Sequence, residues 1–221
     1  MLKVWLLGPA RFDVDGRAAE PSGTPSARLL AYLALSPGRS HGKSALAQQL
    51  WGLRGAEENL RKAIASLRRD FGDPDTFARY VDSKYGTIAL RAEEPGTLWV
   101  DAEEFDRLRH SDPEQALELA RGDFLEQFTD AGDWVEQRRR RYAQRVSETW
   151  TAAIEQRWER GDATAAVALA ERRLDAVPDD QAALRAYMRV QAEAGQPEAA
   201  LAAYEEHMKP LRDRGEAVDQ T

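Results

Sequence analysis

The 221-residue sequence contains no cysteine and only three histidines, His41, His110 and His207, at scattered positions. The absence of cysteine excludes disulfide bonds, zinc–thiolate sites and thiol nucleophiles. The spacing of the histidines matches no metal-binding pattern, so we expect no metal, no cofactor and no catalytic residue. The sequence gives no reason to expect an enzyme.

Long apolar runs are missing as well. No run of about 18 apolar residues occurs, which is the length that a membrane-spanning helix needs. The opening segment, "MLKVWLLGPARFDVDG", becomes charged too early for a signal peptide. These absences predict a cytoplasmic protein with no membrane partner. Its length allows one large domain or two small ones, each with its own core.

The charge is distributed unevenly between the two parts of the chain. Residues 1–91 contain 14 Lys and Arg and 9 Asp and Glu, a net charge of +5. Residues 92–221 contain 17 Lys and Arg and 29 Asp and Glu, a net charge of −12. Such asymmetry fits a nucleic-acid-binding front part joined to a separate module, although two unrelated solvated surfaces would give the same numbers.

The stretch Gly42-Lys43-Ser44 resembles the end of a phosphate-binding P-loop. A P-loop needs four residues between its first glycine and Gly-Lys-Ser/Thr, whereas three separate Gly38 from Gly42. Pro37 also lacks an N–H group to donate, and the preceding run "ARLLAYLAL" favours a helix over a strand. We therefore reject a nucleotide-hydrolysing site and place Lys43 and Ser44 at a helix N-terminus, where N–H groups bind phosphate.

The first 95 residues show the order of a winged helix-turn-helix. "LKVWLLG" and "ARFDVDG" predict two short strands, with Asp15-Gly16 as a hairpin turn, and "RAAE" predicts a third strand. "ARYVDSKYGTIALR" predicts two further strands around a tip at 83–86. Between them, three helices are expected at about 26–35, 43–51 and 56–71. The second helix should bury Leu46, Leu50 and Trp51.

The third of these helices, "AEENLRKAIASLRRDFG", has the pattern of a recognition helix. Its apolar residues form one stripe, made of Leu60, Ile64, Leu67 and Phe71. Lys62 and Arg69 project almost opposite that stripe, beside Ser66, and are predicted to contact bases in a major groove. Flanking arginines and the wing are predicted to bind phosphates. A solvated charged face is the alternative. The predicted DNA contacts are Lys43, Ser44, Arg61, Lys62, Ser66, Arg68, Arg69, Arg79, Lys84 and Tyr85, of which Arg79, Lys84 and Tyr85 are assigned to the wing.

From "LWVDAEEFDRL" onward the pattern is helical and contains an internal repeat. Gly161 and Gly195 lie 34 residues apart, as do Ala166 and Ala200. A helix, a glycine turn and a helix with small residues at this period indicate a tetratricopeptide-like repeat. Two repeats are fewer than the roughly three that a stack needs.

Additional helices are therefore expected to complete the stack, at about 101–121 and 133–146, with Trp134 and Tyr142 between them. The basic run at 138–141 lies inside this acidic part of the chain. We expect its arginines to form ion pairs with neighbouring glutamates rather than to bind nucleic acid.

The order of these segments is similar to that of a known family. "RLLAYLALSPGRSHGKSALAQQLWG" and "NLRKAIASLRRDFG" resemble the DNA-binding domain of bacterial transcription activators of the antibiotic-regulatory-protein type. "LWVDAEEFDRL", "ARGDFLEQF" and "DWVEQRRRRYAQRVSETW" resemble the bacterial transcriptional activator domain that follows it. The resemblance covers about residues 2–211. The tail "RDRGEAVDQT" and the short link "GLRGAEEN" depart from the family pattern.

The resemblance implies a mainly α fold with a small β component. It implies an OmpR-like winged helix-turn-helix domain in residues 1–95 and an all-α, tetratricopeptide-like activator domain in residues 96–221. The implied partners are double-stranded DNA and RNA polymerase, with a homodimer on repeated half-sites. The leading hypothesis is a transcription activator. The alternatives are a protein–protein adaptor whose winged domain does not bind DNA, and an N-terminal fragment of a larger ATPase-containing regulator.

Overall fold

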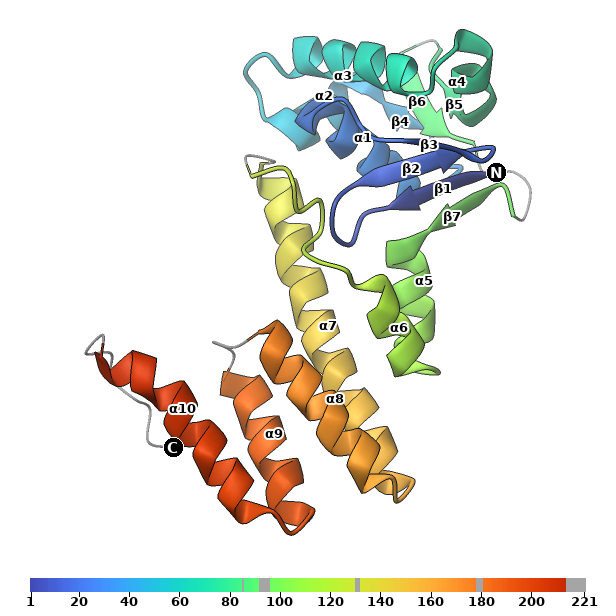
Figure 1. The fold of residues 1–221 in the computed structure, drawn as a ribbon. Coiled ribbons are helices and arrows are strands. Elements are labelled where there is room, and N and C mark those ends of the chain that lie inside the picture. Colours follow the sequence, from blue (N-terminus) through green and yellow to red (C-terminus); the bar gives the residue numbers. More distant parts are fainter. Residues whose placement is uncertain (85, 92–95, 130–131, 178–180, 214–221) are drawn as a thin grey trace. The chain divides into compact units, whose positions relative to one another are not determined.

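The computed structural model describes the chain except residues 85, 92–95, 130–131, 178–180 and 214–221, and it describes the backbone alone for 207–213. Internal contacts divide the chain into two compact units (Figure 1). The first unit comprises residues 1–111 and 115–146, and the second comprises residues 112–114 and 147–221. The predicted division after residue 95 stays a prediction.

The first unit contains a four-stranded sheet in the order β3-β2-β1-β7. The predicted strands are confirmed as β1 (Leu2–Trp5), β2 (Arg11–Val14) and β3 (Arg17–Ala19), and the Asp15-Gly16 turn has positive φ at both residues. β7 (Leu98–Val100) was expected to be helical, and that expectation is wrong. This segment pairs in parallel with β1, a partner so distant in sequence that no local pattern indicates it.

The helices of the winged part follow the prediction closely. They are α1 (Thr24–Ala34), α2 (Lys43–Trp51) and α3 (Ala56–Asp70). The sequence pattern missed α4 (Pro74–Tyr80), so the strand expected at 78–80 is wrong. Asp73 caps α4 by accepting hydrogen bonds from the N–H groups of Asp75 and Thr76, and Pro74 suits the first helical turn.

The wing is the hairpin of β5 (Val81–Asp82) and β6 (Thr87–Leu90). A short strand that the sequence pattern missed, β4 (His41–Gly42), pairs with β6 on its other side. The three strands form a second sheet in the order β4-β6-β5. The start of α2 is thereby attached to the wing.

One core holds the first unit together, and it includes Phe12, Leu67 and Phe71. Leu46 and Leu50 are buried as predicted, but Trp51 is only partly buried. The guanidinium of Arg28 lies over the Trp51 ring at 5.6 Å. Trp51 is the last residue of α2, so its indole packs against the core from the end of that helix and stays partly exposed.

Three further helices follow, α5 (Asp101–Leu108), α6 (Pro113–Leu119) and α7 (Asp133–Glu159). The single helix expected at 101–121 is interrupted before Pro113, because proline cannot continue a helix interior. α5 packs against β1 and β7, which is a different place from the expected stack of repeats. The ring of Tyr142 stacks on the ring of Phe124, with 5.6 Å between their centroids. The ring centroids of Trp134 and Tyr32 lie 5.3 Å apart.

The basic run at 138–141 is part of α7. Arg139 forms the expected ion pair, at 2.5 Å from Glu136, and it also donates to the carbonyl oxygens of Phe124, Leu125 and Phe128. Arg138 lies over the ring of Trp134. These two arginines therefore serve packing within the first unit.

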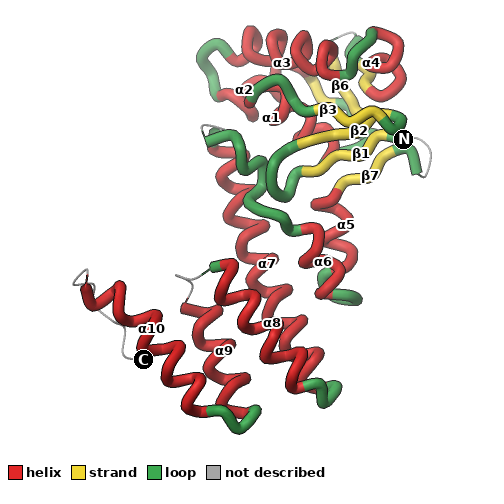
Figure 2. Tube along the Cα trace, viewed as in Figure 1, coloured by secondary structure: helices red, strands yellow, loops and turns green. Residues whose placement is uncertain are grey.

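The second unit consists of helices and connecting loops in its described residues (Figure 2). Along with the C-terminal part of α7 it contains α8 (Ala163–Ala176), α9 (Gln181–Glu193) and α10 (Pro197–Asp213). α9 packs against both α8 and α10. Gly161 and Gly195 end their helices at φ values of 77° and 79°, and Ala166 and Ala200 are buried. The 34-residue repeat therefore corresponds to two successive helix pairs.

Candidate nucleic-acid interface

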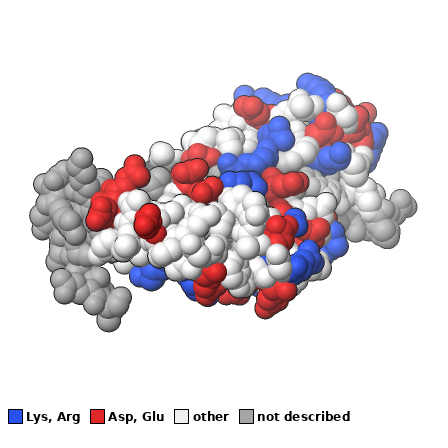
Figure 3. Space-filling view, turned by 60° about the horizontal axis from the view of Figure 1, so that its bottom comes forward, with Lys and Arg blue, Asp and Glu red and all other residues white. Residues whose placement is uncertain are grey.

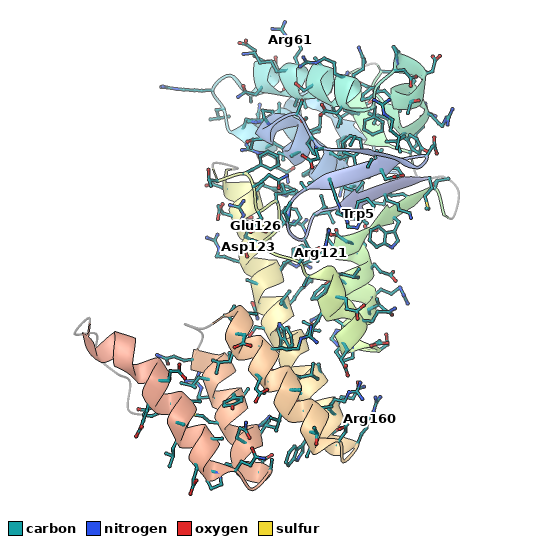
Figure 4. All side chains as sticks on the ribbon, in the orientation of Figure 1. Trp5, Arg61, Arg121, Asp123, Glu126 and Arg160 are labelled. Carbon is teal, nitrogen blue, oxygen red and sulfur yellow. The ribbon has the colours of Figure 1, made fainter. Side chains whose placement is uncertain are left out.

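α3 is held by its apolar side and exposes its basic side. Leu60, Ala63 and Leu67 are buried where α3 packs on α1 and α2. Ile64, which we expected in the same stripe, is only partly buried. Arg61, Lys62, Arg68 and Arg69 are exposed, and Figure 4 shows Arg61 projecting outward from the helix. The amphipathic pattern thus predicted the orientation of α3 correctly.

A groove of about 630 Å³ lies beside α3. The start of α2, one face of α3 and the wing form its walls. The groove brings together four of the predicted phosphate contacts, which come from two separate helices. Its lining residues are Lys43, Ser44, Glu57, Leu60, Arg61, Ile64, Ala65, Arg68, Ser83 and Gly86.

The start of α2 is fixed on the wing by the backbone. The N–H group of Lys43 donates to the carbonyl oxygen of Gly86 at 2.8 Å. Gly42, the N-cap residue, pairs with Thr87 in the ladder between β4 and β6. No side chain of the described residues caps the backbone N–H groups at the start of α2. A helix N-terminus of this kind favours bound phosphate.

The predicted base contacts lie on a different face of α3. Among the described residues, Lys62, Ser66 and Arg69 are not part of the groove lining. Lys62 forms an ion pair with Glu58 at 2.9 Å, and its hydrogen bond lowers the pKa of that carboxyl. Arg69 donates to the hydroxyl of Ser66 at 3.0 Å. Both pairings follow helical spacing, so the sequence could have indicated them.

Glu57 also lines the groove, and the sequence pattern did not indicate it. Its carboxylate accepts a hydrogen bond from the Ser44 hydroxyl at 3.1 Å. An acidic residue in the first turn of a helix is usually explained by its interaction with the helix dipole. That explanation gives no reason to expect Glu57 in a groove. Here it places one negative charge among the cations of the groove.

The wing residues are placed as follows. Lys84 is exposed at the tip, where its carbonyl oxygen accepts from the N–H group of Thr87. Tyr85 lies outside the described residues. The placement of Arg79 in the wing is wrong, because this residue lies on α4 and its guanidinium pairs with Asp15 at 2.9 Å. The missed helix α4 turns Arg79 toward the β2–β3 hairpin.

The structure describes the side chains of two of the three histidines. His41 is buried and bonded to the Ser36 hydroxyl at 2.9 Å, and burial lowers the pKa of its imidazole. His110 is exposed, and the side chain of His207 lies outside the described part. Within the described residues no group of His, Asp and Glu side chains could hold a metal ion. No helix in that part is both long and apolar enough to cross a bilayer.

Comparison with known proteins identifies similarities to both parts of the chain. The family model of the bacterial transcriptional activator domain matches residues 92–216. No curated protein matches the chain. Among solved structures, EmbR of Mycobacterium tuberculosis, in complex with a low-affinity phosphopeptide, aligns with a TM-score of 0.66 at 23% sequence identity. The alignment covers 96% of this chain and 60% of that one, and at this identity the likeness concerns the fold.

Proposed function

Because the chain belongs to the bacterial transcriptional activator domain family, we propose that this transcription regulator binds double-stranded DNA through its winged helix. The observation that carries the proposal is the groove beside α3. It joins Lys43 and Ser44 of α2 with Arg61 and Arg68 of α3, next to a second basic face formed by Lys62 and Arg69.

The two faces of α3 suit two kinds of contact. Arg61 and Arg68 are seven residues apart, so they lie on one side of the helix, and the groove beside them accepts one DNA backbone strand. Lys43, Ser44 and Lys84 contact phosphates of that strand. Lys62 and Arg69, about 100° further round the helix, contact base edges in the major groove together with Ser66.

The contacts of the other predicted residues are less direct. Tyr85 follows Lys84 at the wing tip and is proposed to contact the same backbone. Arg79 is a DNA contact only if it leaves Asp15, so its main role is to hold α4 to the β2–β3 turn. Activation would follow from contact with RNA polymerase, and binding to repeated half-sites from a dimer, as the resemblance to activators of the antibiotic-regulatory-protein type implies.

Titration of labelled duplexes at several salt concentrations tests the proposal. Each phosphate that the protein neutralises adds about 0.9 to the slope of log affinity against log salt. Arg61→Ala and Arg68→Ala should each reduce that slope by about one phosphate and weaken all sequences alike. Arg160→Ala, an exposed arginine of the second unit, is the matched control and should change nothing.

The base contacts are tested on an operator found by footprinting. Lys62→Ala and Arg69→Ala should each cost about 1–3 kcal/mol against that operator and relax its sequence preference. If the protein retards no promoter fragment even at low salt, DNA binding is refuted and the adaptor alternative remains. If binding occurs but neither variant alters sequence preference, the assignment of the base-reading face is refuted.

A further inference from the structure

A second groove, of about 270 Å³, lies in the second unit between α7 and α9. Its floor is formed by three apolar side chains, those of Ile154, Trp158 and Val190. Ile154 and Val190 are only 1% and 2% exposed, and Trp158 is half-buried. Charged side chains stand exposed around this floor. They are Glu155, Glu159, Arg189 and Glu193.

The 34-residue repeat builds this groove from equivalent positions. Glu155 and Arg189 are 34 residues apart, as are Glu159 and Glu193. α7 and α9 are thus the first helices of two successive helix pairs, and they present the same positions side by side. Solenoid proteins form their extended binding surfaces from repeated positions of this kind.

The charge of the groove is negative. Glu155 and Arg189 lie 3.5 Å apart and balance each other. Among the described residues, Glu159 and Glu193 form no ion pair, so two carboxylates remain to act on an incoming group. The second unit as a whole carries 9 Lys and Arg against 17 Asp and Glu, a net charge of −8. In the face drawn in Figure 3, Asp and Glu side chains form several separate clusters.

We propose that this groove docks a basic segment of a partner protein, with an aliphatic or aromatic side chain on Trp158 and Lys or Arg side chains against Glu159 and Glu193. The apolar floor suits one large apolar side chain as a buried anchor of the partner. The carboxylates suit cationic neighbours and repel nucleic acid and anionic lipid surfaces. The proposal concerns the second unit and does not rest on DNA binding by the first.

Selection of short random peptides displayed on phage against the full chain tests the proposal. The enriched peptides should combine at least two basic residues with one large apolar residue. Their affinity, measured with the synthetic peptides by fluorescence anisotropy, should fall as salt rises. Trp158→Ala should weaken binding about ten-fold or more. The double variant Glu159→Gln/Glu193→Gln should weaken it about five-fold.

Two control variants match these changes. Trp150→Ala truncates another half-buried tryptophan of α7, one that lies against Arg172, and should leave peptide affinity unchanged. Glu171→Gln/Glu198→Gln removes two exposed charges from α8 and α10, away from the groove, and should have little effect. All variants should bind DNA as the parent chain does.

The proposal is overturned if no sequence is enriched, or if the enriched peptides are acidic or neutral. It is equally overturned if the peptides bind the Glu159→Gln/Glu193→Gln variant as tightly as the parent chain. This variant changes only exposed side chains, so it remains a valid test if Trp158→Ala alters the far-ultraviolet circular dichroism spectrum.

Discussion

Replacing Glu57 by glutamine tests the proposed phosphate contacts in the groove beside α3, because a carboxylate in this groove would repel a bound phosphate. Ser44 donates its hydroxyl to Glu57 at 3.1 Å, and both residues line the groove with Arg61 and Arg68. A phosphate oxygen that replaces Glu57 as the acceptor of this hydroxyl would lie about 4–5 Å from the carboxylate. Two unit charges at about 4 Å repel by about 1 kcal/mol in water, the medium that applies to this exposed site.

Removing that charge should therefore raise the affinity for non-specific duplex about five-fold at low salt. The affinity is measured by the fluorescence anisotropy of a labelled duplex without an operator. The slope of log affinity against log salt should rise by up to about 0.9 if one more phosphate is neutralised. Glu20→Gln removes an exposed charge before α1, outside the groove lining, and should change affinity less than about two-fold. Unchanged or weaker non-specific binding of Glu57→Gln would refute this reasoning.

The remaining predictions concern stability, measured by urea unfolding. Arg139→Ala should lower the free energy of unfolding by about 3 kcal/mol, because three partly buried carbonyl groups lose their hydrogen-bond donor. Arg140→Ala removes an exposed arginine of the same basic run and should change the free energy of unfolding by less than about 0.5 kcal/mol. Gly8→Ala should lower the free energy of unfolding by about 1–2 kcal/mol, since φ is +110° and a Cβ would lie 3.3 Å from Arg121. Gly23→Ala, at φ 170°, lacks this strain and should lose only the N-cap preference for glycine, about 0.5 kcal/mol, and equal effects of the two changes would contradict the strain argument. Burial raises the pKa of Asp101, so the folded state holds its proton more tightly than the unfolded state. The stability of the parent chain relative to Asp101→Asn should therefore be greatest below pH 3.8 and fall as the pH rises through the raised pKa, and a difference that is flat or grows with pH would contradict it.

Local periodicity predicted the winged-helix elements well where each element carries its own signal. α2 begins at Lys43 and ends at Trp51 as expected, because a glycine stands on each side and the leucines recur at helical spacing. α4 lacks such a signal, because seven residues are too few to show a period; its local indications are the cap residue Asp73 and Pro74 in the first turn. β7 is defined by its pairing with β1, which is a contact between distant parts of the sequence.

The site was predictable one helix at a time. The exposure of Arg61, Lys62, Arg68 and Arg69 follows from the apolar stripe of α3 alone. The position of Glu57 against Ser44 depends on how α2 and α3 pack, because the two residues are thirteen positions apart with two glycine turns between them. From the sequence of α3 alone, Glu57 is explained by its interaction with the helix dipole. Only the tertiary structure places it in the groove.

The family domain and the packing unit divide this chain at different places. The activator-domain model begins at residue 92, yet the first packing unit extends to residue 146. Asp101 has its carboxylate fully buried and accepts the N–H groups of Leu6 and Leu7, at 2.7 and 3.0 Å. Gln127 exchanges two hydrogen bonds with the backbone of Ala10. Since the connection from β1 to β2 obtains hydrogen-bond partners from these residues, the winged-helix part is completed by segments that the sequence family assigns to the activator domain. Substitutions near Asp101 should thus act on the stability of the winged-helix part as well as on the domain to which the sequence family assigns them.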